Sequence, residues 1–211
     1  MRSLRVAFAL ALVAVLGVAG DRQAKAQGGL RVVAQTGADV QGVQWRTNRT
    51  ASWEAAKANS PMIAGAALQT GVRSVDVQLS DGSRLILAPS TVVQFQDPMD
   101  VDIDRGASTR ASRVDIKQGA LEAHVAKGVG KALLVVAQND IFAAFRPGKA
   151  RAKLSSEGLL AVVEEGSARV ASKGQWVSVN QGEYVLLRDR GRPEAPKLFP
   201  PAPSMSGQPC V

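Results

Sequence analysis

The sequence predicts an all-β protein, in which serial β-hairpins form a β-solenoid-like or twisted β-roll domain that is followed by a disordered, proline-rich tail. Apolar and polar residues alternate in several segments between residues 67 and 187, which is typical of strands with one buried face. A short pattern ending in glycine recurs in the same region. The composition, with 20 glycines and only 4% aromatic residues, favours strands joined by tight turns.

The recurring pattern reads apolar, any, apolar, any, any, glycine. Its copies occupy residues 77–82, 114–119, 161–166 and 177–182, and another apolar stretch follows each glycine. Glycine adopts the positive φ of a tight hairpin turn without a clash of Cβ, so turns are expected at these points. The irregular spacing of the copies argues against a strict repeat array. The predicted turn residues are Gly71, Asp81, Gly82, Gly119, Gly166 and Gly182.

The N-terminus has the composition of a secretory signal peptide. Arg2 and Arg5 precede an apolar run over residues 6–20, and Ala24-Lys25-Ala26 provides a small-residue cleavage site. A membrane-spanning helix needs about 20 apolar residues, so cleavage after Ala26 is expected, with a retained anchor as the alternative. Six of the ten prolines lie in residues 191–211, which we predict to form a proline-rich tail. The predicted organisation is therefore a signal peptide at 1–26, a β domain at 27–190 and this tail at 191–211. The predicted location is periplasmic or secreted.

The chain carries a formal charge of +8, of which residues 1–26 contribute +3 and the remainder +5. A modest positive charge favours anionic partners such as cell-wall polymers or acidic proteins. A uniformly solvated basic surface is the alternative, because the charges are not clustered in the sequence. No nucleic-acid partner is predicted.

Few residues of the chain are suited to catalysis. His124 is the single histidine and Cys210 the single cysteine, which excludes a two-histidine metal site and an internal disulfide within one chain. Adjacent Glu164 and Glu165 fit a turn better than the facing carboxylates of a glycosidase. We therefore predict no catalytic residues, no cofactor and no enzymatic activity.

Two groups of residues are candidates for binding. Asp97, Asp100, Asp102 and Asp104 could hold Ca²⁺ if their segment turned, but the glycine and glutamate positions of a calcium loop hold Arg105 and Ala111, so no metal site is predicted. Trp45, Trp53 and Trp176 could form a binding surface if exposed, or fill the core. Residues 96–112 are predicted to form a loop, and residues 52–58 one or two helical turns.

The hairpin region resembles the FecR domain, a family of bacterial periplasmic sensor and regulator domains. The likeness lies in Trp53 and the segments 65–71, 74–85, 162–170 and 177–183, and extends over about residues 40–188. Family members of the signalling type carry a cytoplasmic anti-sigma segment, a membrane helix and a receptor-contacting C-terminal part, which this sequence does not match. The resemblance therefore implies an exported, non-catalytic recognition or sensory module that binds an envelope protein or glycan. The alternative is a structural or assembly component bound to the cell wall or outer membrane through a basic surface. The sequence leaves the binding residues, the ligand and the oligomeric state open.

Overall fold

The computed structural model describes residues 32–104, 107–128, 131–137, 141–188 and 192–198. Within these residues the chain forms β-strands and no helix, which confirms the all-β prediction. The helical turns predicted for residues 52–58 are wrong, because Glu54 and Ala55 pair as a short strand with the preceding one. The predicted signal peptide lies outside the described residues, as do residues 199–211 of the predicted tail.

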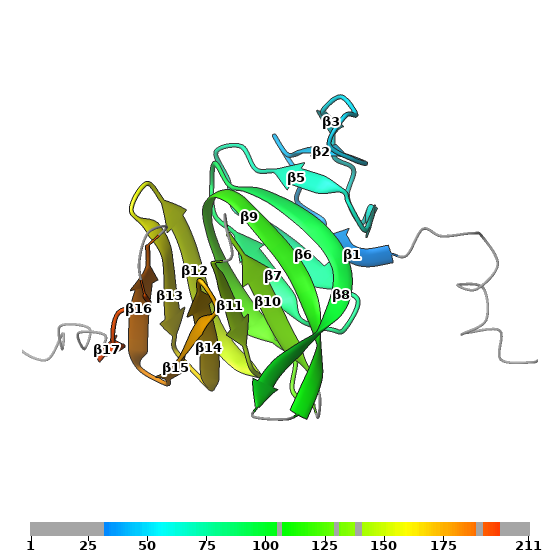
Figure 1. Cartoon of the computed structure of the whole chain (residues 1–211). Helices are drawn as coiled ribbons and strands as arrows, with labels where there is room; N and C mark the ends of the chain where they lie inside the picture. The colour runs from blue at the N-terminus through cyan, green and yellow to red at the C-terminus, as the bar shows by residue number, and fades with distance from the viewer. Residues whose placement is uncertain (1–31, 105–106, 129–130, 138–140, 189–191, 199–211) are drawn as a thin grey trace, which may run out of the picture. The chain divides into compact units, whose positions relative to one another are not determined.

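The strands form one large sheet that is mixed and does not close, and their pairing divides it into two parts, called here sheet A and sheet B (Figure 1). Sheet A contains, in spatial order, β4 (Pro61–Ile63), β1 (Val32–Thr36), β6 (Val75–Leu79), β7 (Arg84–Leu87), the second part of β9 (Ala107–Val125), β12 (Gly148–Ser155), β13 (Gly158–Val163), β16 (Glu183–Leu187) and β17 (Lys197–Leu198). Sheet B contains β3 (Glu54–Ala55), β2 (Gln44–Arg46), β5 (Ala67–Gln69), β8 (Val92–Asp104), the first part of β9, β10 (Ala132–Val136), β11 (Phe142–Phe145), β14 (Ser167–Ser172) and β15 (Gln175–Asn180).

Strand β9 belongs to both sheets. Residues 107–118 pair with β8 in sheet B, and residues 119–125 pair with β7 and β12 in sheet A. The change of partner falls at Gly119, whose φ is +88°. The sequence predicts a hairpin turn at Gly119, but the structure places this glycine inside a continuous strand that bends from one sheet to the other.

Most of the other predicted turn residues also lie where the chain changes sheet. Gly71 follows β5 of sheet B and precedes β6 of sheet A, and Gly166 and Gly182 join β13 to β14 and β15 to β16. Asp81 and Gly82 lie in the hairpin between the paired strands β6 and β7, where Asp81 Oδ1 accepts a hydrogen bond from the Ser83 amide at 2.8 Å. The glycine pattern therefore marks corners between sheets as well as hairpins, because both require a positive φ or a close backbone approach.

Side chains from both sheets fill one main core. Alternation along the strands sends Val93, Phe95, Val114 and Ile116 of sheet B into this core, together with Leu85, Leu121 and Leu159 of sheet A. These side chains are at most 2% exposed. The buried residues are mostly valine, leucine, isoleucine and alanine, as the low aromatic content of the sequence requires.

The loop predicted for residues 96–112 is wrong. This segment is an extension of β8 and β9 that pairs from Met99–Ala111 to Asp104–Ala107, beyond a bulge at Asp97 and Pro98. The strands continue because Val101 and Ile103 pack in a second buried cluster with Ala132, Leu134 and Ala144 on the outer side of sheet B. In Figure 1 the extension is the crossing pair of green ends below the label β8. We call residues 99–104 of β8 and 107–111 of β9 the arm.

The observed pairing does not show a solenoid, because the described strand pairs are antiparallel, with β9 and β10 the one parallel pair among them. Within the predicted tail, Lys197 and Leu198 form β17 against β16. Among the described residues, the structure has no helix of the length and apolar character needed to cross a membrane.

Candidate functional site

The outer faces of the two sheets carry different arrangements of charge. On the outer face of sheet A, anions and cations are matched across the strands. Asp76 Oδ1 accepts a hydrogen bond from Arg84 Nε at 2.6 Å. Farther along, Lys149 Nζ lies 3.4 Å from Glu122 Oε1 and 3.0 Å from Glu164 Oε2, and Arg151 Nε lies 2.6 Å from Glu164 Oε1.

These contacts shift the acid–base equilibria of the side chains on sheet A. The hydrogen bond from Arg84 is the main cause of a lowered pKa of Asp76. Burial on its own would raise the pKa of Glu122, but hydrogen bonds with His124 and Lys149 outweigh burial and lower it. The hydrogen bonds with Glu164 and Glu122 raise the pKa of Lys149. Apart from the exposed Lys153, the acids and cations described on this face balance one another in internal pairs, so sheet A offers little net field to a charged partner.

The outer face of sheet A also contains an apolar groove of about 530 Å³. It lies over β7, β9, β12 and β13, with Ile86, Leu160 and Val162 in its wall. Its charged rim includes Glu122 and Arg151, both of which are held in the pairs described above.

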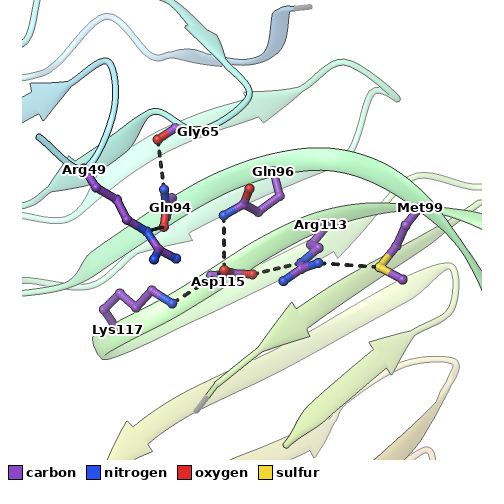
Figure 2. A network of polar contacts seen from close by, with 8 residues as sticks. All are labelled: Arg49, Gly65, Gln94, Gln96, Met99, Arg113, Asp115 and Lys117. Atoms are coloured by element: carbon purple, nitrogen blue, oxygen red, sulfur yellow. Dashed lines mark hydrogen bonds and ion pairs between the residues drawn. The ribbon is translucent and has the colours of Figure 1, made fainter. Parts of the chain in front are cut away.

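The outer face of sheet B is dominated by cations that share few acids. Arg113, Asp115 and Lys117 alternate along β9 with the core residues Val114 and Ile116, so these three side chains point outward together. Asp115 accepts hydrogen bonds from Arg113 Nε at 3.0 Å, Gln96 Nε2 at 3.2 Å and Lys117 Nζ at 3.5 Å (Figure 2). Its side chain is 5% exposed, whereas those of Arg113 and Lys117 are 33% and 42% exposed.

This arrangement makes Asp115 an internal anchor and leaves the cations accessible. A buried carboxylate needs charge-assisted hydrogen bonds to compensate for its lost hydration, and Arg113, Lys117 and Gln96 supply them. Arg113 also donates to Met99 Sδ at 3.8 Å, which fixes the guanidinium along the strand (Figure 2). Because one carboxylate is shared between two cations, a net positive charge remains at the surface.

The positive charge on the outer face of sheet B continues toward β5 through Arg49. Arg49 Nε donates to Gln94 Oε1 at 3.4 Å, and Gln94 Nε2 donates to the carbonyl oxygen of Gly65 at 3.0 Å (Figure 2). Gln94 is thereby buried to 7% exposure beneath an exposed arginine. On the neighbouring strand, the Arg46 guanidinium lies 4.6 Å from the ring centre of Trp53.

On the other side of the arm, the same face is aromatic. Phe142 and Trp176 meet edge to face, with ring centres 4.7 Å apart and an interplanar angle of 77°. The Arg169 guanidinium lies 4.6 Å from the Trp176 ring centre, and its Nη1 donates to the carbonyl oxygen of Ile103 at 3.1 Å. Arg146 Nη2 donates to the same oxygen at 3.3 Å. The arginines therefore hold the arm and leave a partly exposed tryptophan beside it.

We call Arg49, Arg113, Lys117, Arg169 and Trp176 the cationic face. The sequence pointed to Trp53 and Trp176 as surface candidates, and the structure leaves both partly exposed with an arginine against each ring. Trp45 is also partly exposed but packs against the main core. The four cations are missed by sequence reasoning, because Arg49, the Arg113–Lys117 segment and Arg169 are distant in the sequence and reach the outer side of sheet B only through strand pairing. The alternation Arg113-Val114-Asp115-Ile116-Lys117 was the available signal.

The other sequence candidates do not assemble into a site. Asp100 pairs with Arg110 at 3.2 Å on the arm, and Asp97 and Asp102 are exposed. His124 Nε2 lies 2.7 Å from Glu122 Oε1 on sheet A, far along β9 from the cationic face. No group of three or more histidine, cysteine, aspartate or glutamate side chains suited to a metal ion occurs in the part of the chain that the structure describes. Cys210 lies outside that part.

Comparison with known proteins supports the sequence resemblance. A family model described as "FecR protein" matches residues 66–169. A crystal structure of a candidate anti-sigma factor from Parabacteroides distasonis aligns with a TM-score of 0.50 and 16% sequence identity, covering 63% of this chain and 59% of that one. A second crystal structure of a candidate anti-sigma factor from the same organism gives a TM-score of 0.49, with 16% identity, 62% coverage of this chain and 57% of the other.

The chain spans about three fifths of the length of these crystallised proteins, and at this identity the likeness concerns the fold. No curated protein matches the chain. The family match extends from β5 into β14 and so includes Arg113, Asp115 and Lys117, the centre of the cationic face. The alternating strands, the glycine corners and the matched segment together show that this chain contains a FecR family domain at residues 66–169.

Proposed function

We propose that this chain is an exported, non-catalytic recognition module with a sensory role in the bacterial cell envelope. Its cationic face would bind an acidic surface of an envelope protein. The FecR family match supports recognition rather than catalysis, and the structural neighbour of the anti-sigma class supports a role in signalling.

The observation that carries this proposal is the contrast between the two outer faces. On sheet A, Arg84 pairs with Asp76, and Lys149 and Arg151 are balanced by two acids, Glu122 and Glu164. On sheet B, Arg113 and Lys117 share Asp115, and Arg49 is hydrogen-bonded to an uncharged amide. Accessible cations beside low-dielectric aromatic surface attract anions more strongly than evenly paired charges do.

A protein partner is favoured over a simple polyanion by the aromatic part of the face. Tryptophan and arginine are the residues that most often dominate protein interfaces, especially where the tryptophan is rigidly held. Trp176 is held by Phe142 and Arg169, so little side-chain entropy would be lost when a partner covers it. A purely electrostatic binder would not need this fixed aromatic element.

In-cell photo-crosslinking tests the proposal. A photo-reactive phenylalanine analogue would replace Met99, which is 38% exposed and contacts Arg113, and in a matched control Val72, which is 89% exposed on the β5–β6 connection. We expect one discrete protein adduct from position 99 and none from position 72. Diffuse capture of peptidoglycan or lipid at both positions would support the structural or assembly role instead.

Charge-matched variants make the test specific to the face. Arg49→Gln with Lys117→Gln removes two cations from the cationic face, while Arg73→Gln with Lys153→Gln removes two from outside it. The position-99 adduct should decrease at least about tenfold in the first double variant, because each lost contact weakens an electrostatic encounter. It should change little in the second. Equal decreases in both variants would mean that net charge alone drives binding and would reject a specific face.

A further inference from the structure

The groove on the outer face of sheet A is part of a longer apolar surface. Its wall contains Ile86 of β7 and Leu160 and Val162 of β13. On β16, Leu186 lies opposite Leu160 and Tyr184 lies opposite Val162, so their side chains lie on the same face. Leu160, Tyr184 and Leu186 are all half-buried. The apolar surface therefore extends from β7 across the sheet to β16, the strand that pairs with β17.

The last described segment is fixed to the edge of sheet A beside this surface. Glu194 Oε1 accepts a hydrogen bond from Arg188 Nη1 at 2.7 Å, and Glu194 Oε2 accepts one from Lys197 Nζ at 3.1 Å. Arg188 directly follows β16, so these bonds and the pairing of β17 with β16 hold the segment in place. Lys197 pairs with Tyr184 of β16, and β16 pairs with β13 of the groove. The chain therefore leaves β17 two strands away from the groove, or about 10 Å.

We infer that residues 199–211, which lie outside the described residues, fold back across β16 and occupy the groove. The length of this segment permits the placement. Five strand spacings separate β17 from β7 at the far wall of the groove, which amounts to about 24 Å. The 13 residues from 199 to 211 span about 40 Å in a polyproline conformation. The segment is thus long enough to cross β16 and to lie over β13, β12, β9 and β7.

The composition of residues 199–211 matches the polarity of the groove. The segment contains four prolines together with Phe199, Met205 and Val211, and it has no Asp, Glu, Lys, Arg or His. The groove is apolar, and apart from Lys153 the acids and cations around it balance one another, so it favours an uncharged occupant. Proline-rich segments bind apolar grooves at a low cost in entropy, because their extended conformation is preformed.

The covalent tether makes a weak contact sufficient. A short linker holds the segment near the groove at an effective concentration on the order of 1 mM. With a dissociation constant of about 0.1 mM, the segment would occupy the groove about nine tenths of the time. A second copy would have to reach a similar concentration in solution to compete, which favours the chain's own segment. The groove lies on sheet A and the proposed partner binds sheet B, so the inference is independent of the function proposed above.

Cys210 provides the test, because it is the single cysteine of the chain and lies within the inferred occupant. A nitroxide spin label on Cys210 of the signal-free chain should broaden the methyl NMR signals of Ile86, Leu160 and Val162. We expect these signals to lose at least about half of their intensity, in line with the occupancy estimated above. The methyl signals of Val136, which packs on the outer side of sheet B, should keep their intensity.

A charge placed in the groove should weaken the contact. Leu160→Lys changes a half-buried position in the wall, so the fold should be retained while the dissociation constant rises at least about tenfold. The broadening should then decrease by about half. Val72→Lys is the matched control, since Val72 is 89% exposed and lies outside the groove, and it should leave the broadening unchanged.

Removal of residues 199–211 gives a second measurement that needs no change in the groove. In the chain without a spin label, this truncation should shift the methyl signals of Ile86, Leu160 and Val162. A synthetic peptide of residues 199–211, added above its dissociation constant, should shift them back. Groove signals that do not respond to the truncation would overturn the inference.

Three other outcomes would also overturn it. Equal broadening at Val136 and in the groove would show a segment that docks nowhere. Broadening in a mixture of spin-labelled chain with isotope-labelled chain that lacks the spin label would assign the contact to a second copy. Groove signals that move after refolding from guanidinium, which strips bound lipid, but not after removal of residues 199–211 would assign the groove to a lipid.

Discussion

Gly119 lies directly against Thr91 at the point where β9 passes from sheet B to sheet A. Thr91 is fully buried, and its hydroxyl accepts a hydrogen bond from the Ala120 amide at 3.1 Å and donates one to the Ala120 carbonyl at 3.0 Å. A Cβ at position 119 would overlap the Thr91 hydroxyl and come within 2.7 Å of its Cα. Glycine is thus required here by space as well as by its φ of +88°.

We therefore predict that Gly119→Ala destabilises the domain by more than about 3 kcal/mol. The positive φ costs about 1–2 kcal/mol, and the overlap with Thr91 forces the backbone of two strands apart. Urea unfolding followed by circular dichroism would measure the change.

Gly82→Ala is the matched control, because Gly82 has nearly the same φ of +89° but its added Cβ would meet only Ala126 Cβ, at 3.9 Å. Gly82→Ala should lower the free energy of unfolding by about 1–2 kcal/mol, which is the cost of the positive φ alone. Equal losses in the two variants would show that the Thr91 contact contributes nothing.

Asp115→Ala is predicted to destabilise the domain by about 1–3 kcal/mol. It leaves Arg113 and Lys117 as neighbouring like charges and removes the acceptor of Gln96 Nε2. Part of this loss should be recovered in about 1 M NaCl, since salt screens repulsion between partly exposed cations. Thermal unfolding at low and high salt would measure both effects.

The corresponding control is Asp100→Ala on the arm. Asp100 and Arg110 are 62% and 54% exposed, so their ion pair should contribute less than about 0.5 kcal/mol. A loss at Asp100 as large as that at Asp115 would contradict the distinction between a buried anchor and a surface pair.

The strands and the corners of the fold can be predicted from the sequence alone, but the assignment of the strands to two sheets cannot. Periodicity two is visible in 75–79 because Val75, Val77 and Leu79 share one buried face. The glycine at 119 and the glycine at 82 look alike in sequence, since both follow the same apolar pattern. Only long-range pairing decides that one bends a strand and the other closes a hairpin.

In the arm, the local composition leads to the wrong prediction of a loop. Asp97, Pro98 and Asp100 give the segment the polarity of a loop, and proline disfavours a strand interior. In the structure the proline lies at a bulge, while Val101 and Ile103 find a buried surface on Leu134 and Ala144, which lie distant in the sequence. The cationic face was hidden for the same reason: Arg49 and Arg113 are brought to one face by the order of strands.

Packing of the arm leads to a further prediction. Ile103 is 2% exposed, and its carbonyl oxygen accepts the bonds from Arg146 and Arg169. Ile103→Ala should cost about 2–4 kcal/mol and loosen the arm, because it removes a buried side chain from a small cluster. Amide hydrogen exchange over residues 99–111 should then accelerate more than exchange in β12 and β13.

Val72→Ala serves as the control for the arm, since Val72 is 89% exposed. It should alter neither stability nor exchange at residues 99–111. If exchange in Ile103→Ala rose uniformly across the domain, the arm would be part of the main cooperative unit and not a separately docked element.

Acid should destabilise the domain partly through Glu122. Contacts with His124 and Lys149 lower the folded-state pKa of Glu122 below its usual value of 4.5. A lowered folded pKa contributes stability that is present above the unfolded pKa and is lost as the pH falls through the folded value. The pKa of Asp76 is lowered from its usual value of 3.8, mainly by the hydrogen bond from Arg84, so protonation of Asp76 in acid also destabilises the folded domain. The melting temperature should therefore fall as the pH decreases below about 5.

Glu122→Gln should be less stable than wild type at neutral pH but should lose less stability between about pH 5 and about pH 3, because its side chain no longer takes up a proton on unfolding. Glu157→Gln, at the exposed β12–β13 turn, provides the comparison and should retain the wild-type slope. An acid slope of Glu122→Gln as steep as that of wild type would show that Glu122 does not couple folding to protonation.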